Sequence, residues 1–281
     1  MASKRLRAFV KGMRPYVDRM PWLAATYRNM RESLPSRFGQ ADMTALGFRF
    51  AGHHLMRTGE FEPHETRFLD EELPRSDVFV DIGANIGYFT CLARSRDVHT
   101  IAVEPLEQNL RVAYRNIRAN EWTDRLEVFP VALSDGPGLL DLYGVSTGAS
   151  LIRGWAGSSS RIVRTVPVST LDTLLAGRFS DARLLIKIDV EGAELQVLRG
   201  AHQTLKRNPQ PRWLVEVCFD ENQDGINPDF SAVFELFWTN GYRAETVEER
   251  RPVRQTDVRE WIKTGRRSFG SYNFLFLPER S

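Results

Sequence analysis

From Asp77 to Asn240 the chain alternates short apolar runs with stretches in which apolar residues recur every three or four positions. The runs are typical of strands buried on both faces of a sheet, and the recurring positions predict amphipathic helices between them. The expected strands span residues 78–81, 99–105, 126–133, 184–189 and 212–219, with a final pair at 241–247 and 272–278. We therefore predict an α/β fold with a doubly wound, seven-stranded, mostly parallel sheet whose last strand is antiparallel.

The first 45 residues do not follow this alternation, and Pro15, Pro21 and Pro35 interrupt them. We expect a basic helical segment over residues 1–45 and a single domain over residues 46–281. Apolar residues between positions 6 and 13 recur at helical spacing among basic ones, which predicts a basic amphipathic helix.

Charge is distributed unevenly along the chain, although the 38 Lys and Arg and 36 Asp and Glu leave a formal net charge of only +2. Nine of the basic residues but only two acidic ones lie in the first 37 positions, so this segment is +7 and the remainder is −5. An acidic body argues against a nucleic-acid partner. We expect the basic helix to pack on the domain or on a second subunit, with contact at a membrane surface as the open alternative.

Two further expected strands, GLLDLYG at residues 138–144 and RTVPVST at residues 164–170, are predicted to pair with each other. A long polar connection separates them. A loop of this length either lies over an active site or is a flexible insertion. In the helix that follows, Asp172 stands in the first turn, where a carboxylate has a structural role.

A glycine-punctuated turn follows the first expected strand of the domain, in DVFVDIGANIGYFT at residues 77–90. Gly83 and Gly87 allow backbone angles closed to other residues and let main-chain N–H groups approach a ligand at a helix N-terminus. The spacing fails the dinucleotide fingerprint G-x-G-x-x-G, because Asn85 and Tyr88 occupy glycine positions. Glu104 stands 21 residues beyond Gly83, where nucleotide folds place a carboxylate that accepts the ribose hydroxyls.

The stretch LLIKIDVEGAELQVL, residues 184–198, contains a second group of charged residues in a buried strand. Lys187 and Asp189 share one face, because alternate residues of a strand point to the same side. Burying either of them unpaired would cost several kcal/mol, so they pair with each other, bind a ligand or lie at the open end of the strand.

Two of these motifs, VDIGANIGYFT and the Asp189–Gly192 sequence DVEG, resemble motifs of the FkbM-type family of class I S-adenosylmethionine-dependent methyltransferases. The resemblance implies S-adenosylmethionine as the cofactor. The residues that it implies for the cofactor site are Asp81, Gly83, Ala84, Asn85, Gly87, Glu104, Ala132 and Asp135. For Asp135 a turn beside Gly136 is the alternative interpretation.

The resemblance also implies a reaction, the O-methylation of a hydroxyl on a sugar, glycan or secondary metabolite. A hydroxyl needs a base to take its proton, and we expect Asp189 or Glu191 to do so, with His53 or His54 as alternatives. Lys187 completes the set of candidate catalytic residues. A nicotinamide-dependent oxidoreductase and a cofactor-binding module without turnover are the alternative functions.

Metal binding and disulfide formation are not expected. Adjacent residues such as His53 and His54 point to opposite faces of a strand, and no further His or Cys spacing completes a metal site. The two cysteines, Cys91 and Cys218, lie inside apolar runs, which favours a reducing cytoplasm. No apolar run approaches the roughly 18 residues of a membrane span.

Overall fold

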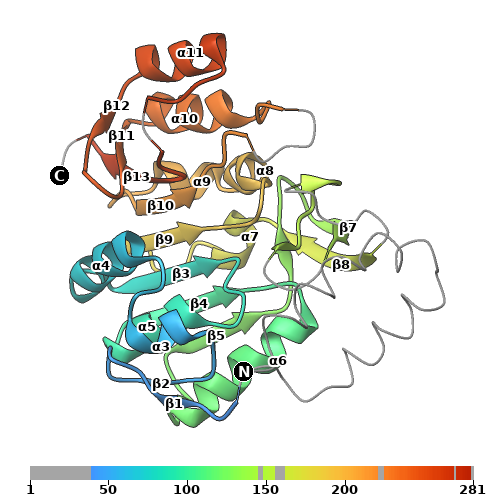
Figure 1. Cartoon of the computed structure of the whole chain (residues 1–281), viewed down its shortest axis with the longest axis vertical. Coiled ribbons are helices and arrows are strands. Elements are labelled where there is room, and N and C mark those ends of the chain that lie inside the picture. Colours follow the sequence, from blue (N-terminus) through green and yellow to red (C-terminus); the bar gives the residue numbers. More distant parts are fainter. Residues whose placement is uncertain (1–38, 145–147, 156–161, 221–224, 269, 280–281) are drawn as a thin grey trace, which may run out of the picture. The chain divides into compact units, whose positions relative to one another are not determined.

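An eight-stranded sheet forms the centre of the structure, a computed structural model that describes residues 39–144, 148–155, 162–220, 225–268 and 270–279 (Figure 1). Residues 40–281 form one compact unit. The strands, in spatial order, are β12 (Pro252–Val253), β11 (Tyr242–Thr246), β13 (Asn273–Pro278), β10 (Arg212–Glu216), β9 (Leu184–Ile188), β3 (Val78–Ile82), β4 (His99–Val103) and β5 (Leu126–Phe129). The predicted fold class is confirmed, and β12 is a two-residue addition to the seven strands expected.

The direction of the strands follows the prediction. From β10 to β5 every neighbouring pair is parallel, whereas β13 is antiparallel to both β10 and β11. All five residues of β3 are buried, as a strand covered on both faces requires.

The helices form two groups, and the main contacts between helices lie within each group, as expected of a doubly wound fold. The first group contains α4 (Pro63–Glu72), α5 (Tyr88–Ser95) and α6 (Glu107–Ala119). The second contains α7 (Leu171–Leu175), α8 (Glu194–Arg199), α9 (His202–Lys206), α10 (Phe230–Thr239) and α11 (Gln255–Thr264). Within the described ranges, no helix is long and apolar enough to cross a membrane.

The largest apolar cluster takes alternate residues of the central strands. Val78, Val80 and Ile82 of β3 pack with side chains of the second helix group, such as Leu195 and Phe234. Because side chains alternate across a sheet, Phe79 and Asp81 point to the opposite face. There the Thr90 hydroxyl of α5 donates a hydrogen bond to the Asp81 carboxylate.

The prediction of one strand over residues 126–133 is wrong in one respect, because the chain leaves the central sheet after Phe129. Pro130 follows, and proline cannot donate to a strand ladder. Ala132–Leu133 then forms β6, which joins a separate three-stranded sheet with β8 (Val163–Ser169) and β7 (Gly138–Tyr143). The predicted pairing of β7 with β8 is confirmed as antiparallel.

A short hairpin, helix and turn precede the central strands. β1 (Asp42–Met43) pairs with β2 (Arg49–Phe50), and α3 (His54–Thr58) follows. A one-turn helix, η1 (Leu73–Arg75), connects α4 to the first central strand. The expected helices of residues 1–38 lie outside the described residues, so their prediction stands untested.

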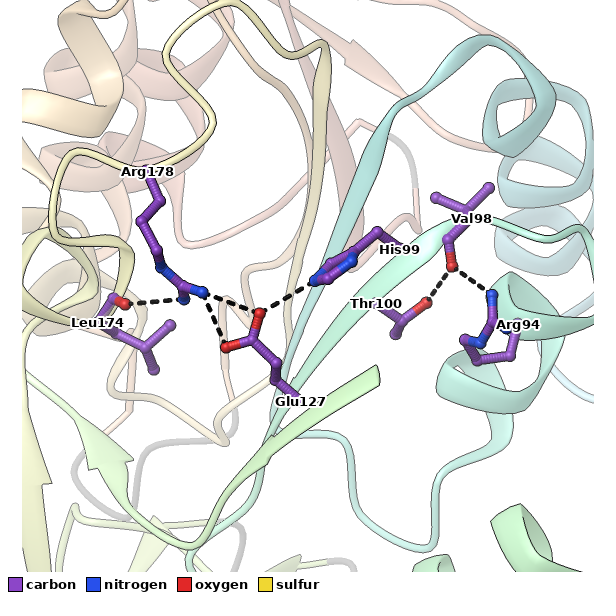
Figure 2. Close-up of polar contacts among 7 residues, drawn as sticks. All are labelled: Arg94, Val98, His99, Thr100, Glu127, Leu174 and Arg178. Atoms are coloured by element: carbon purple, nitrogen blue, oxygen red, sulfur yellow. Dashed lines mark hydrogen bonds and ion pairs between the residues drawn. The ribbon is translucent and has the colours of Figure 1, made fainter. Parts of the chain in front are cut away.

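A polar network ties β4, β5 and the end of α7 together, near the amino ends of the strands (Figure 2). Both carboxylate oxygens of Glu127, in β5, accept hydrogen bonds from Arg178 Nη1, at 2.9 and 3.0 Å. His99 Nε2 lies 3.0 Å from Glu127 Oε1. Arg178 also donates to the carbonyl oxygen of Leu174 in α7 at 3.4 Å. This network therefore connects the end of α7 to the edge of the sheet at β5.

Candidate active site

A cavity of about 370 Å³ opens at the carboxyl ends of β3, β4, β9 and β10. Its wall also includes residues of β6 and β7 and of the loop that precedes α4. Ligands of open α/β sheets bind at this edge, so the position agrees with the expected site.

The glycine turn after β3 forms one side of this cavity. Gly83 and Ala84 donate their backbone N–H groups to the carbonyl oxygen of Val103, at 2.9 and 3.0 Å. Gly83 has φ +83°, and a Cβ there would lie 1.8 Å from the carbonyl oxygen of Asp189. Only glycine fits this close approach, as the sequence predicted.

Glu104, at the end of β4, lies on the cavity wall and organises the loops around it. Its carboxylate accepts from the backbone N–H groups of Asn85 and Leu106, both at 2.8 Å, and from the amide of Asn109 at 3.2 Å. The residue is 5% exposed, and this burial raises the pKa of Glu104 to about 7 against the opposing effect of the hydrogen bonds.

Asp81 and Lys187 face each other on the neighbouring strands β3 and β9, beneath the cavity. Lys187 Nζ lies 2.7 Å from Asp189 Oδ2 and 5.0 Å from the centre of the Phe89 ring. Burial acts to lower the pKa of Lys187, but the carboxylates of Asp189, Glu62 and Asp81 outweigh it and raise the pKa. Of the alternatives left open for these two residues, the structure shows the ion pair, and it also places Asp189 on the cavity wall at the end of β9. The lysine is an ammonium.

Besides Glu104, four carboxyl groups line the cavity: Glu62, Glu216, and Asp189 and Glu191 of the turn after β9. Glu62 precedes α4 in a left-handed conformation with φ +40°, and burial raises its pKa to about 7. Glu216, the last residue of β10, shares a hydrogen bond with Asp189.

The two members of this carboxyl pair have opposite protonation states. Burial raises the pKa of Glu216 far above its usual value, and the adjacent Asp189 carboxylate adds to the effect. Burial also opposes the ionisation of Asp189, but Lys187 outweighs it and lowers the pKa. Asp189 is therefore an anion held by Lys187, and Glu216 carries the proton between them.

Part of the long loop between β7 and β8 packs on the turn after β9. Trp155, 1% exposed, donates its indole N–H to Glu191 Oε2 at 3.2 Å, and Ser150 donates to the Glu191 carbonyl at 2.5 Å. At Gly192, φ +98°, a Cβ would lie 2.5 Å from the Trp155 ring. Residues 148–155 thus follow the first interpretation of this loop, that it lies over the site.

The predicted site residues divide into three groups. Gly83, Asn85, Glu104, Ala132, Asp189 and Glu191 line the cavity. Asp81, Ala84, Gly87 and Lys187 lie behind this wall, where they build the turn and the strands that support it. Asp135 is exposed and does not line the cavity, which favours the turn interpretation.

The sequence interpretation missed Glu62 as a wall residue. Glu62 differs from its neighbours in the loop by its left-handed backbone conformation, which is unusual for a residue other than glycine. The sequence does not show this conformation. The placement of the two histidines on a strand is also wrong, because His53 caps α3 and His54 begins it. His53 lines the cavity, and no cluster of three metal-binding side chains occurs in the described part of the chain.

Residues 81–244 match the model of the methyltransferase FkbM domain, and this range starts at the carboxyl end of β3 and includes the whole cavity edge of the sheet. The chain belongs to this family. As an FkbM methyltransferase it is 29% identical to methyltransferase sdnD of Sordaria araneosa, over 58% of this chain and 73% of that protein.

The chain is also similar to solved structures at lower identity. A putative O-methyltransferase of Klebsiella pneumoniae has 15% identity and a TM-score of 0.44, over 89% of this chain and 86% of that one. The O-methyltransferase of Bacillus cereus, solved in complex with SAH, has 14% identity and a TM-score of 0.43, over 79% and 83% of the two chains.

The methyl donor of this FkbM methyltransferase is S-adenosylmethionine. The cavity fits such a ligand, because Gly83 leaves the turn without a side chain and Glu104 presents a carboxylate at the end of β4. Asn85 Oδ1 on the same wall is a buried acceptor with no partner among the described residues. The Gly83 turn, Asn85 and Glu104 would hold the donor, which supplies an electrophilic methyl group when bound.

Proposed function

We propose that this FkbM methyltransferase methylates a hydroxyl oxygen of a sugar, glycan or secondary metabolite, with Glu62 as the base. The observation that carries this proposal is the Glu62 carboxyl on the cavity wall, whose pKa is raised to about 7. A base is most effective when its pKa lies near the working pH, because it is then both deprotonated and basic.

The other carboxyl groups of the cavity wall suit this task less well, and Glu104, whose pKa is also raised to about 7, is the one that would hold the donor. Asp189 is an ion-paired anion of lowered pKa, hence a weak base, and Glu216 is protonated. Glu191 is fixed by the indole of Trp155. Glu62 therefore replaces Asp189 and Glu191 as the favoured acceptor of the hydroxyl proton, and its carboxylate becomes neutral when it takes that proton.

We expect Glu62→Gln to lower kcat by about 10²–10⁴-fold, the usual contribution of a general base. The substitution removes the proton acceptor but keeps the size of the side chain. The measurement is transfer of a labelled methyl group to a panel of hydroxylated acceptors, followed over pH 5 to about 9. The wild type should gain activity as the pH rises through about 7, where Glu62 ionises, and the variant should lack this limb.

Glu60→Gln is the matched control, because Glu60 lies in the same loop but is exposed. Both variants should keep the thermal stabilisation by S-adenosylhomocysteine. A Glu62→Gln enzyme with the wild-type pH profile would exclude Glu62 as the base. Failure to label any hydroxyl acceptor, with donor binding intact, would favour the cofactor-binding module instead.

A further inference from the structure

A second cavity, of about 280 Å³, is lined by four arginines. We call it the arginine cavity and define it by Arg75, Arg212, Arg243 and Arg250. Glu72 is the one carboxylate on its wall among the described residues, and Phe68, Leu277 and Pro278 supply the apolar part.

The arginine cavity and the candidate active site lie at opposite ends of two shared elements. Arg212 is the first residue of β10 and Glu216 its last, so about 13 Å of strand separate them. Glu62 precedes α4 and Glu72 ends it, which corresponds to about 15 Å of helix. The arginine cavity is therefore a separate site near the amino ends of the parallel strands.

The ion pairs of the arginine cavity leave an excess of positive charge. Arg75 and Arg212 both pair with Glu72, the former at 3.1 Å. Outside the wall, Glu245 pairs with Arg243 at 3.0 Å and with Arg250 at 2.9 Å. Four guanidinium groups thus share two carboxylates, and the cluster carries a net charge of +2.

The four guanidinium groups also keep unused hydrogen-bond donors. Each has five N–H bonds, and only one nitrogen of Arg75, Arg212 and Arg250, and two of Arg243, have partners in the described structure. Both carboxylate side chains are nearly buried, at 11% and 13% exposure, whereas the arginines are 38% to 67% exposed. The carboxylates accept from Nη1 of Arg75 and Arg212 and from Nε of Arg243 and Arg250, and the remaining donors stay accessible.

We propose that the arginine cavity binds the phosphate or pyrophosphate group of a small molecule. Guanidinium forks match the oxygens of a phosphoryl group in pairs, and a net charge of +2 balances the charge of such a group. Charge balance alone would need one arginine for each buried carboxylate, not two. The volume, close to the lower limit for ligand pockets, suits a small anionic group.

Calorimetric titration of the 281-residue chain with inorganic pyrophosphate tests this proposal. We expect binding that weakens with added salt, and a loss of affinity of at least tenfold in the Arg243→Gln/Arg250→Gln double variant. Arg111→Gln is the matched control, because Arg111 forms an exposed ion pair with Glu107 on α6 and is not on the cavity wall. Unchanged stabilisation by S-adenosylhomocysteine shows that each variant is folded.

Glu72→Gln gives a result of opposite sign. This substitution removes the competing negative charge, so pyrophosphate should bind several-fold more tightly, which no loss of structure would produce. Wild-type affinity in the double variant, equal weakening in Arg111→Gln, or no binding at millimolar pyrophosphate would overturn the proposal.

Two further ligands distinguish the sources of the phosphoryl group. A nucleoside diphosphate that competes with pyrophosphate supports a small-molecule ligand. Binding to vesicles that contain phosphatidylglycerol, without binding of pyrophosphate, contradicts the proposal and indicates a membrane surface. These measurements do not use methyl transfer, so they stand whether or not the proposed reaction is correct.

Discussion

Gly83 lies where the turn after β3 touches the backbone of Asp189, and two features require glycine there. The φ angle of +83° is strained for other residues, and a Cβ would overlap the Asp189 carbonyl oxygen. The turn and the DVEG segment are therefore built to fit each other. A side chain at this position would push apart the two segments that form the cavity wall.

We expect Gly83→Ala to weaken S-adenosylhomocysteine binding by at least tenfold and to cost about 2 kcal/mol of unfolding free energy, since backbone strain and a steric clash act together. Calorimetric titration and urea unfolding measure the two effects. Gly136→Ala is the control, because a Cβ there meets nothing within 4 Å. Donor affinity within twofold of the wild type would show that the turn does not hold the donor.

Most elements could be predicted from the sequence, because apolar periodicity follows local structure and the buried strands carry it clearly. The break at Pro130 was not visible in the apolar pattern, since residues 126–133 read as one continuous run. The glycine turn and Glu104 were found because both adjoin strand ends. Glu62 was not found, because it reaches the cavity through the packing of the loop before α4. No local sequence pattern indicates that packing.

The Glu127 network illustrates how elements are joined, and its charge should affect stability. Burial acts to raise the pKa of Glu127, but hydrogen bonds from Arg178 and His99 outweigh it and lower the pKa. A lowered carboxyl pKa stabilises the fold above the unfolded-state pKa, and this contribution is lost as the pH falls through the folded-state pKa.

We therefore expect Glu127→Gln to lower the unfolding free energy at pH 7 by about 1 kcal/mol, the upper range for a partly exposed ion pair. The difference from the wild type should disappear in strong acid, where the carboxylate is protonated in both states. Urea unfolding at several pH values measures it, with the exposed Glu107→Gln variant as control. A difference that persists in acid would assign the effect to packing rather than to charge.

On the scale of the whole molecule, several buried carboxyl groups have raised pKa values. Burial raises the pKa of Glu62 and Glu104 to about 7 and that of Glu194 to about 8. A raised carboxyl pKa means that the folded state binds more protons than the unfolded one between the two pKa values. Stability should therefore fall as the pH rises from about 4.5 to about 8.

Glu194→Gln tests this relation, because Glu194 accepts a hydrogen bond from Gly192 N at 2.9 Å that glutamine can also accept. The variant should reduce the decline in unfolding free energy by up to about 1.4 kcal/mol per pH unit, the effect of one proton. Chemical unfolding of both proteins across this range gives the two slopes. Identical slopes would mean that Glu194 ionises alike in the folded and unfolded states.

The position of β13 has a consequence for the order in which the sheet is completed. This strand follows every other strand along the chain, yet it lies between β10 and β11 and pairs with both. During synthesis the sheet therefore exists in two separate parts, each with an open edge of unpaired N–H and C=O groups. These two unpaired edges can associate with other chains until residues 273–278 are synthesised and pair with both of them.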